Sequence, residues 1–91
     1  MDHKRQLNKI ISDAISGRMS VVSFSDTFEP IFNLEIDKSK LTPGELQAYS
    51  DLFDVVVWYS PFPEERAAIP NYVDERAVLD AAKKAASALK L

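Results

Sequence analysis

The sequence contains no cysteine, only two glycines and one histidine, and no long apolar run. Without cysteine, disulfide bonds, thiolate metal ligands and a cysteine nucleophile are excluded. Gly17 and Gly44 are too far apart to form a glycine-rich phosphate-binding loop. The longest uninterrupted apolar stretch, Val55 to Tyr59, is far shorter than the roughly 20 residues that a membrane span needs. We therefore expect no membrane association, no bound metal and no cofactor.

The first residues also lack the continuous apolar core of a signal peptide, because Ser12, Asp13 and Ser16 interrupt the apolar positions there. Together with the absence of cysteine, this favours a cytoplasmic protein. A chain of 91 residues with 46% hydrophobic content suits one domain with a modest core. We expect residues 1–91 to form that single helical domain.

The acidic residues are concentrated in the middle of the chain. Residues 26–65 carry nine carboxylates and two lysines, a net charge of −7, whereas the whole chain carries −3. These carboxylates are Asp26, Glu29, Glu35, Asp37, Glu45, Asp51, Asp54, Glu64 and Glu65. An acidic segment of this size suggests a surface that binds a basic partner.

Hydrophobic spacing and capping residues predict four helices. They are expected over residues 4–16, from residue 21 onward, over residues 43–59 and after residue 74. The clearest start is Thr42-Pro43-Gly44-Glu45, which combines a capping hydroxyl, a proline at the first helical position and a glutamate that can return a hydrogen bond. In this third helix, the core stripe is expected at Leu46, Tyr49, Phe53 and Val56.

Pro30 lies within the predicted second helix. Because proline lacks an amide hydrogen and clashes with the preceding turn, the helix should kink or stop there. No alternating strand pattern competes with the helices. We predict an all-α fold, an antiparallel four-helix bundle with a kinked second helix.

No residue pattern indicates catalysis or a small-molecule substrate. Glu64 and Glu65 are adjacent in a proline-rich segment that offers no separate environments to drive two carboxyl pKa values apart. Ser25-Asp26 superficially resembles the serine that carries the prosthetic group in acyl carrier proteins. Those proteins place Asp-Ser-Leu at the start of their second helix, whereas Ser25 precedes an aspartate within a helix, so the match fails. We expect a protein that is not an enzyme and has no catalytic residue.

Direct binding of nucleic acid is not expected either, because phosphate contacts need a dense basic face. The basic residues are divided between the two ends of the chain, and the acidic middle would repel a polyanion.

A protein-binding face remains. On a helical wheel Trp58 lies between Asp51 and Asp54, opposite the core stripe, and an exposed aromatic residue beside charges is typical of an interface anchor. Two alternatives remain open: Trp58 could be covered by the loop that carries Phe62, and the carboxylates could form an ordinary solvated surface.

Four short segments share their order with a known family. They are Met19 to Asp26, then Leu41-Thr42-Pro43 followed by Leu52-Phe53, then Tyr59-Ser60-Pro61 with Arg66, and Asn71-Tyr72-Val73-Asp74 before the last helix. In this order the chain resembles the colicin D immunity protein family and related immunity proteins of contact-dependent growth inhibition systems. The resemblance extends from about residue 10 to residue 89. In the family, acidic residues flank the proline directly, where this chain has Ser60 and Phe62.

The resemblance implies a four-helix bundle that neutralises a cognate transfer-RNA-cleaving toxin. Family members present acidic side chains to the basic cleft in which the toxin would take its RNA. The implied partner is a basic toxin nuclease domain, and the candidate toxin-binding residues are Asp51, Asp54, Trp58, Glu64 and Glu65. The alternative is a small helical adaptor or regulator that docks on another protein through the same face.

Overall fold

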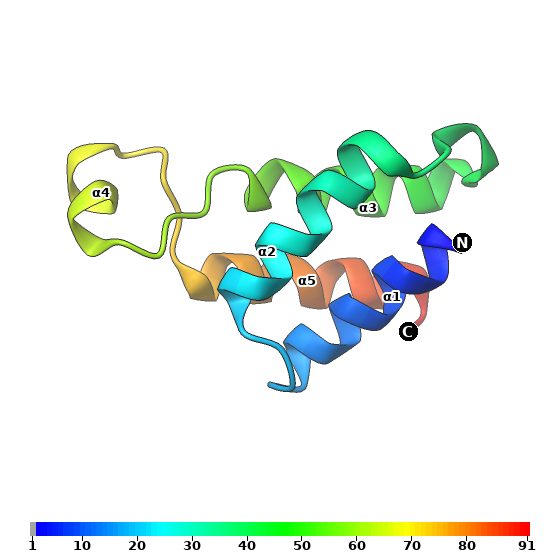
Figure 1. Ribbon diagram of the computed structural model, residues 1–91, viewed down its shortest axis with the longest axis horizontal. Helices are drawn as coiled ribbons and strands as arrows, with labels where there is room; N and C mark the ends of the chain where they lie inside the picture. The colour runs from blue at the N-terminus through cyan, green and yellow to red at the C-terminus, as the bar shows by residue number, and fades with distance from the viewer. Residues whose placement is uncertain (1) are drawn as a thin grey trace.

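A computed structural model describes residues 2–91 and shows an all-α structure (Figure 1), which confirms the predicted fold class. Its five α-helices are α1 (His3–Ile15), α2 (Val21–Pro30), α3 (Pro43–Val56), α4 (Pro63–Ala68) and α5 (Glu75–Leu89). A π-helical turn, η1 (Ile31–Glu35), continues from α2, and a 3₁₀ turn, η2 (Lys38–Lys40), precedes α3. Among the described residues, no helix is both long enough and apolar enough to cross a membrane.

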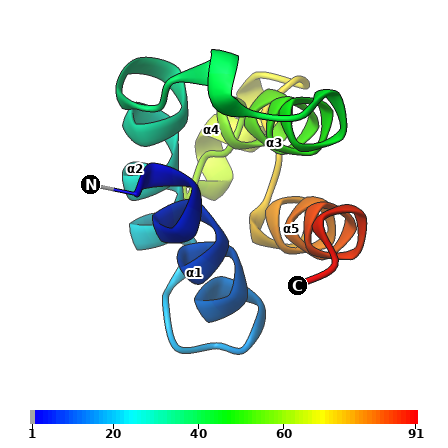
Figure 2. The ribbon, with the colours of Figure 1, turned by 90° about the vertical axis from the view of Figure 1, so that its right-hand side faces the viewer.

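The helices form two packed pairs. Viewed end-on, α1 and α2 lie on one side, and α3 and α5 lie side by side on the other (Figure 2). The contact between α3 and α5 is the most extensive in the structure, and these two helices run in opposite directions. In contrast, α4 projects from one end of the molecule (Figure 1) and lengthens it to 39 Å along its longest axis.

Four of the α-helices begin with a capping side chain, including the predicted cap at Thr42. Asp2, Ser20, Thr42 and Asp74 each accept a hydrogen bond from the backbone N–H three residues later, at 3.0–3.1 Å. Glu45 completes the capping box by accepting from the Thr42 N–H at 2.9 Å. Its other carboxylate oxygen lies 2.7 Å from the Lys4 ammonium, so the same side chain joins the start of α3 to α1. The hydrogen bond from Lys4, and then the one from Thr42, lower the pKa of Glu45.

A column of phenylalanines joins the two pairs of helices. The rings of Phe24 and Phe28 are stacked with centroids 5.4 Å apart, and Phe28 and Phe32 with centroids 5.9 Å apart. The Phe32 ring then meets Phe53 of α3 at 5.4 Å and Tyr49 at 6.1 Å. Aromatic pairs in this range add to the free energy gained by burying their surface.

Pro30 marks a change in helical hydrogen bonding. The α-helix ends at this residue and the chain continues as the π turn, which is closed by a 2.9 Å hydrogen bond from the Ile36 N–H to the Ile31 carbonyl. The Lys38 ammonium donates to the Phe32 carbonyl at 2.7 Å and lies 4.7 Å from the centre of the Phe32 ring. This lysine therefore satisfies a carbonyl that the end of the helix leaves free.

The core stripe of α3 differs from the predicted one. Leu46, which was expected in the core, is 36% exposed, whereas Leu52 is 1% exposed and packs in the core with Tyr49 and Val56. The helix also ends at Val56 rather than at Tyr59. The physical reason is that α5 covers α3 along the side that carries Leu52, so the buried stripe is rotated from the one that Leu46 would have shared.

The two leucines of α3 provide a matched test of this rotation. We expect Leu52→Ala to lower the free energy of unfolding by about 2–5 kcal/mol, because it leaves a cavity in the core. Leu46→Ala, the same substitution on the same helix, should cost less than about 1 kcal/mol. Urea unfolding followed by circular dichroism measures both, and equal costs would contradict the observed burial.

Tyr49 makes the stability sensitive to alkaline pH. Burial, and then the Glu45 carboxylate, raise the pKa of its hydroxyl to about 12, while the hydroxyl donates a hydrogen bond to Asn8. The folded state therefore retains this proton more firmly than the unfolded chain, whose tyrosines titrate near about 10. The stabilisation is complete below about pH 10 and decreases as the pH rises toward about 12. In Tyr49→Phe, unfolding experiments should show a shallower loss of stability over this window than in the parent protein; Tyr72→Phe, at a half-buried position, is the control.

Candidate functional site

Backbone hydrogen bonds join the segment between α3 and α4 to the segment between α4 and α5. The Val73 N–H donates to the Trp58 carbonyl at 2.8 Å, and the Ser60 N–H donates to the Val73 carbonyl at 3.1 Å. These bonds form an isolated parallel bridge between Tyr59 and Val73. Both ends of the segment that carries α4 are thus tied together beside the start of α5.

Ser60 holds α4 in place within this segment. Its side chain is only 3% exposed, and its hydroxyl donates to the Glu65 carboxylate at 2.5 Å and accepts from the Phe62 N–H at 3.2 Å. The Ser60 carbonyl accepts from the Arg66 guanidinium at 2.7 Å. Sequence reasoning assigned Ser60 no such role. No pattern in the sequence distinguishes it, because its partners come from the following helix.

The proline-rich segment after Phe62, which the sequence predicts as a loop, contains α4. The missed signal is Pro63 followed by Glu64 and Glu65, since proline at the first helical position and acidic residues in the first turn both favour a helix start. The same proline signal had correctly placed the start of α3.

Trp58 lies on the surface at the base of α4. It is 44% exposed, and its ring packs at 6.0 Å and 50° against Tyr72, which comes from the chain just before α5. Of the two alternatives that the sequence left open for Trp58, cover by the loop that carries Phe62 does not bury it, because Trp58 stays 44% exposed and Phe62 is itself 54% exposed. Trp58 is therefore an exposed aromatic residue with one supported face.

The five candidate binding residues fall into three groups. Trp58 and Asp54 lie one helical turn apart at the end of α3, and both are exposed. Glu64 is exposed on the first turn of α4, next to Glu65, which is engaged with Ser60. Asp51 lies a further turn back on α3, where it accepts a hydrogen bond from Gln47 at 2.6 Å and borders a groove between α3 and α5.

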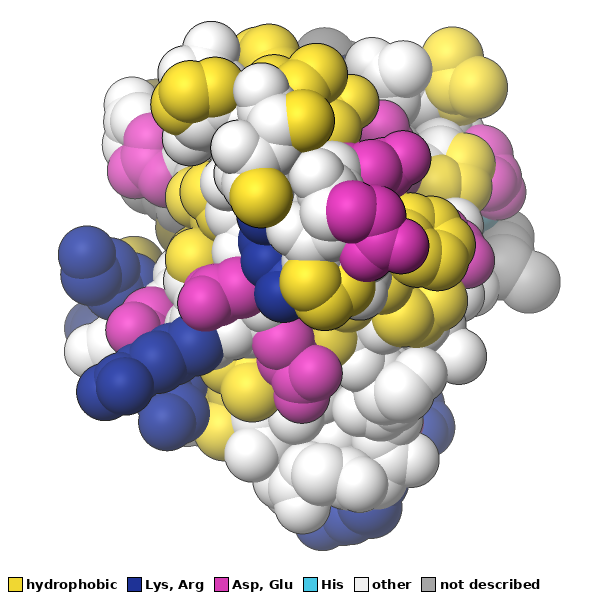
Figure 3. Space-filling view, turned by 90° about the vertical axis from the view of Figure 1, so that its left-hand side faces the viewer, with side chains coloured by type: hydrophobic (Ala, Val, Ile, Leu, Met, Phe, Trp, Pro, Cys, Tyr) yellow, Lys and Arg dark blue, Asp and Glu magenta, His cyan; other side chains and the backbone are white. Residues whose placement is uncertain are grey.

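We call the exposed residues at the end of α3 and on or beside α4, namely Asp54, Val57, Trp58, Phe62, Glu64 and Ile69, the α4 face. Its four apolar side chains are 38–54% exposed. Figure 3, which looks onto this end of the molecule, shows acidic side chains beside hydrophobic ones, with Lys and Arg side chains toward one side and also between acidic side chains near the centre. Exposed apolar surface rimmed by charge is typical of a protein interaction site.

Tyr59, which forms the bridge that supports α4, is influenced by charged residues of both signs. Burial, and then the Glu75 carboxylate, raise its pKa, whereas the Arg66 guanidinium lowers it and Asp26 of α2 adds a smaller rise. Neither Glu75 nor Asp26 is a candidate from the sequence, because only the fold brings α2 and the start of α5 toward Tyr59.

Other carboxylates of the acidic segment have local structural roles. Glu45 caps α3 and pairs with Lys4, Glu35 lies 3.6 Å from the His3 ring, and Asp37 accepts from the Ser39 N–H at 3.0 Å and from its hydroxyl at 2.6 Å. In contrast, within residues 2–91 neither Asp54 nor Glu64 lies within 4 Å of a basic nitrogen or accepts a hydrogen bond. The α4 face thus carries two carboxylates whose charge is not paired within this range, and Asp26 and Glu29 of α2 are in the same condition.

Two further observations concern the chemistry of the surface. Ser25 is only 5% exposed, so its hydroxyl is not presented for attachment of a prosthetic group. Across residues 2–91, His, Asp and Glu side chains form no group of three or more that could hold a metal ion.

Comparison with family models, with curated proteins and with solved structures finds no match to this chain.

The role of Ser60 can be tested by local exchange. Ser60→Ala removes the hydroxyl that bonds both Glu65 and the Phe62 N–H, so we expect faster amide hydrogen exchange at Phe62 and Arg66, with core amides unaffected. The cost in global stability should be about 1 kcal/mol. Ser87→Ala, at an exposed position of α5, is the control, and unchanged exchange in α4 of the Ser60 variant would contradict the assignment.

Proposed function

We propose that the protein is an immunity protein that binds a basic toxin nuclease domain and covers its active-site cleft with the α4 face. The observation that carries this proposal is the exposure of Trp58 and Phe62 beside Asp54 and Glu64, whose charges are not neutralised within residues 2–91. The proposal includes the four-helix bundle that the resemblance to the colicin D immunity protein family implies. The bundle would consist of α1, α2, α3 and α5, antiparallel and kinked at Pro30, with α4 as the projecting element.

The two components of the face would act at different stages of binding. Uncompensated carboxylates attract a basic cleft over about 8 Å at physiological salt and so raise the association rate. Once the surfaces meet, apolar side chains lose their contact with water and slow dissociation. Trp58 is suited to this second role because Tyr72 already restricts one side of its ring, which lowers the entropy lost on binding.

The geometry supports distinct roles for the five candidate residues. Asp54, Trp58 and Glu64 would contact the toxin, since their side chains are exposed. Glu65 would act mainly by holding α4 through Ser60. Asp51, farther along α3 and bonded to Gln47, would lie at the edge of the contact.

The alternative, a helical adaptor for some other protein, would use the same face. An immunity protein should bind tightly to a toxin domain encoded beside its own gene, whereas an adaptor should bind more weakly and to several proteins. Inspection of the neighbouring upstream gene for a toxin-like C-terminal domain therefore distinguishes the two and supplies the partner for the binding test.

Charge reversal at the α4 face tests the proposal. Using the domain encoded upstream, we expect Asp54→Lys and Glu64→Lys to reduce the association rate and to weaken its dependence on salt. Thermal stability should change by less than about 0.5 kcal/mol, because both positions are exposed. Glu35→Lys, at the opposite end of the molecule, is the matched control. Stopped-flow association between low and high salt measures the effect, and rates indifferent to salt in the parent protein would contradict polyanion mimicry.

Trp58→Ala separates the apolar contribution from the electrostatic one. We expect a loss of about 2 kcal/mol or more of binding free energy, mainly through faster dissociation. The cost to folding should stay below about 1.5 kcal/mol, since the ring is partly exposed and is supported by a single aromatic partner. Unfolding of this variant would remove Trp58 as an anchor.

A further inference from the structure

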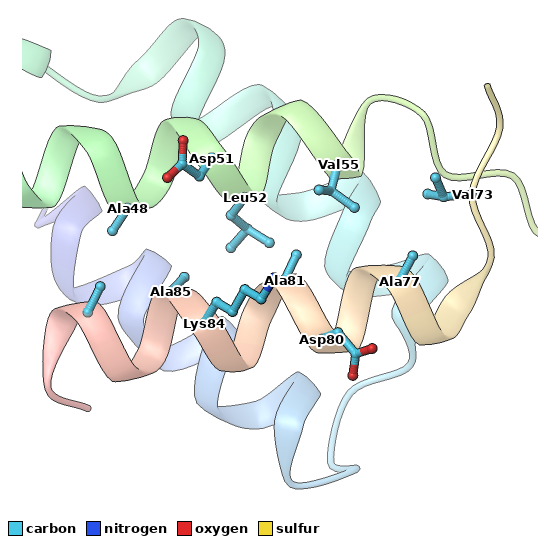
Figure 4. Close-up of a pocket in the computed structure, with 11 residues that line it drawn as sticks. Ala48, Asp51, Leu52, Val55, Val73, Ala77, Asp80, Ala81, Lys84 and Ala85 are labelled. Atoms are coloured by element: carbon cyan, nitrogen blue, oxygen red, sulfur yellow. The ribbon is translucent and has the colours of Figure 1, made fainter.

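A second surface of the molecule is an open groove between α3 and α5 (Figure 4). Its volume is about 460 Å³. Its lining is mostly apolar: Ala48, Leu52, Val55, Val73, Ala77, Ala81, Ala85 and Ala88. The α5 side is built from alanines, so another helix could approach its backbone closely. This groove lies along the α3–α5 pair, apart from the projecting α4 (Figures 1 and 4).

The charged residues that border the groove are of both signs. Asp80 and Lys84 come from α5, one helical turn apart, and Asp51 comes from α3 (Figure 4). Asp80 and Lys84 are exposed, and within residues 2–91 neither is within ion-pairing distance of an opposite charge. The edge of α5 thus carries one free carboxylate and one free ammonium at a spacing of four residues.

We propose that this groove binds a second copy of the same chain, with the two α5 helices antiparallel across a two-fold axis close to Ala82. A two-fold axis at that point places residue 80 of one copy opposite residue 84 of the other, and the reverse. Each Asp80 then faces the Lys84 of its partner, which forms two equivalent ion pairs. Both residues lie on the same edge of α5, so the apolar floor of the groove remains available for packing.

The charge pattern distinguishes this occupant from others. A basic helix would be attracted by Asp51 and Asp80 but repelled by Lys84, and an acidic helix would meet two carboxylates. A surface with the inverse arrangement of Asp80 and Lys84 satisfies both, and α5 of a second copy in antiparallel orientation is such a surface. With 15 residues, α5 is about 22 Å long, so the contact is at the small end of specific interfaces. We therefore expect a reversible dimer.

The experiment is a charge swap followed by sedimentation equilibrium over a wide concentration series. Asp80→Lys places lysine opposite lysine at both pairs, and Lys84→Glu places glutamate opposite aspartate. Each single variant should weaken self-association about tenfold or more. The double variant D80K/K84E should restore it, because both pairs become attractive again. Lys83→Glu makes the same charge change at the next residue, outside the groove, and is the control.

Mixing the two single variants gives the sharpest outcome. In a mixed dimer of D80K with K84E, both pairs are attractive, so the mixture should associate more tightly than either variant alone. Circular dichroism melts confirm that each variant is folded. A parent protein that stays monomeric throughout the series would overturn the proposal and leave the groove to a different partner. Equal effects of Lys83→Glu and Lys84→Glu, or a mixture no tighter than its components, would also overturn it. Because no toxin takes part, these results are independent of the proposed immunity function.

Discussion

The contact of Phe32 with α3 is the interaction on which the rest of the structure depends. Phe32 lies beyond Pro30, where a regular α-helix ends, and the π turn keeps its ring stacked on Phe28. From there it reaches Tyr49 and Phe53, so α2 and α3 share one aromatic cluster. Lys38 stabilises this arrangement by bonding the Phe32 carbonyl. Together with the packing of α5 along α3, this contact sets the direction of α3 and therefore the position of the segment attached to its end.

The α4 face is built on that end of α3 by polar bonds rather than by a core. Val73 makes two backbone hydrogen bonds, to the Trp58 carbonyl and from the Ser60 N–H, which join the chain segments that flank α4. The Ser60 side chain holds the helix itself. Because α4 packs extensively on no other helix of residues 2–91, its apolar side chains stay in water. Such exposure has no benefit for folding, so a partner that covers these side chains gains the free energy of their burial.

The sequence alone predicted the helical class, the caps and most helix starts, because these depend on local signals such as the Thr42 and Glu45 capping box. It was wrong where tertiary contacts decide. The buried side of α3 depends on where α5 packs, so Leu52 and not Leu46 lies in the core. Ser60 could not be recognised because its partners acquire their positions only when α4 forms. The sequence left open whether Trp58 is exposed, and the structure places it 44% exposed; the binding residues and the partner of their face stay predictions.

The net charge of residues 26–65 does not by itself show where the acidic surface lies. Glu45, Glu35 and Asp37 contribute to the sequence count, yet they are engaged with Lys4, His3 and Ser39 at the end of the molecule opposite α4. Their charge is partly compensated locally, and it acts on the fold more than on an approaching partner. Asp54 and Glu64, which have no basic partner within residues 2–91, belong to the α4 face with its exposed apolar side chains. Since long-range attraction and apolar burial act at different distances, a surface that combines them can attract a basic protein quickly and then retain it.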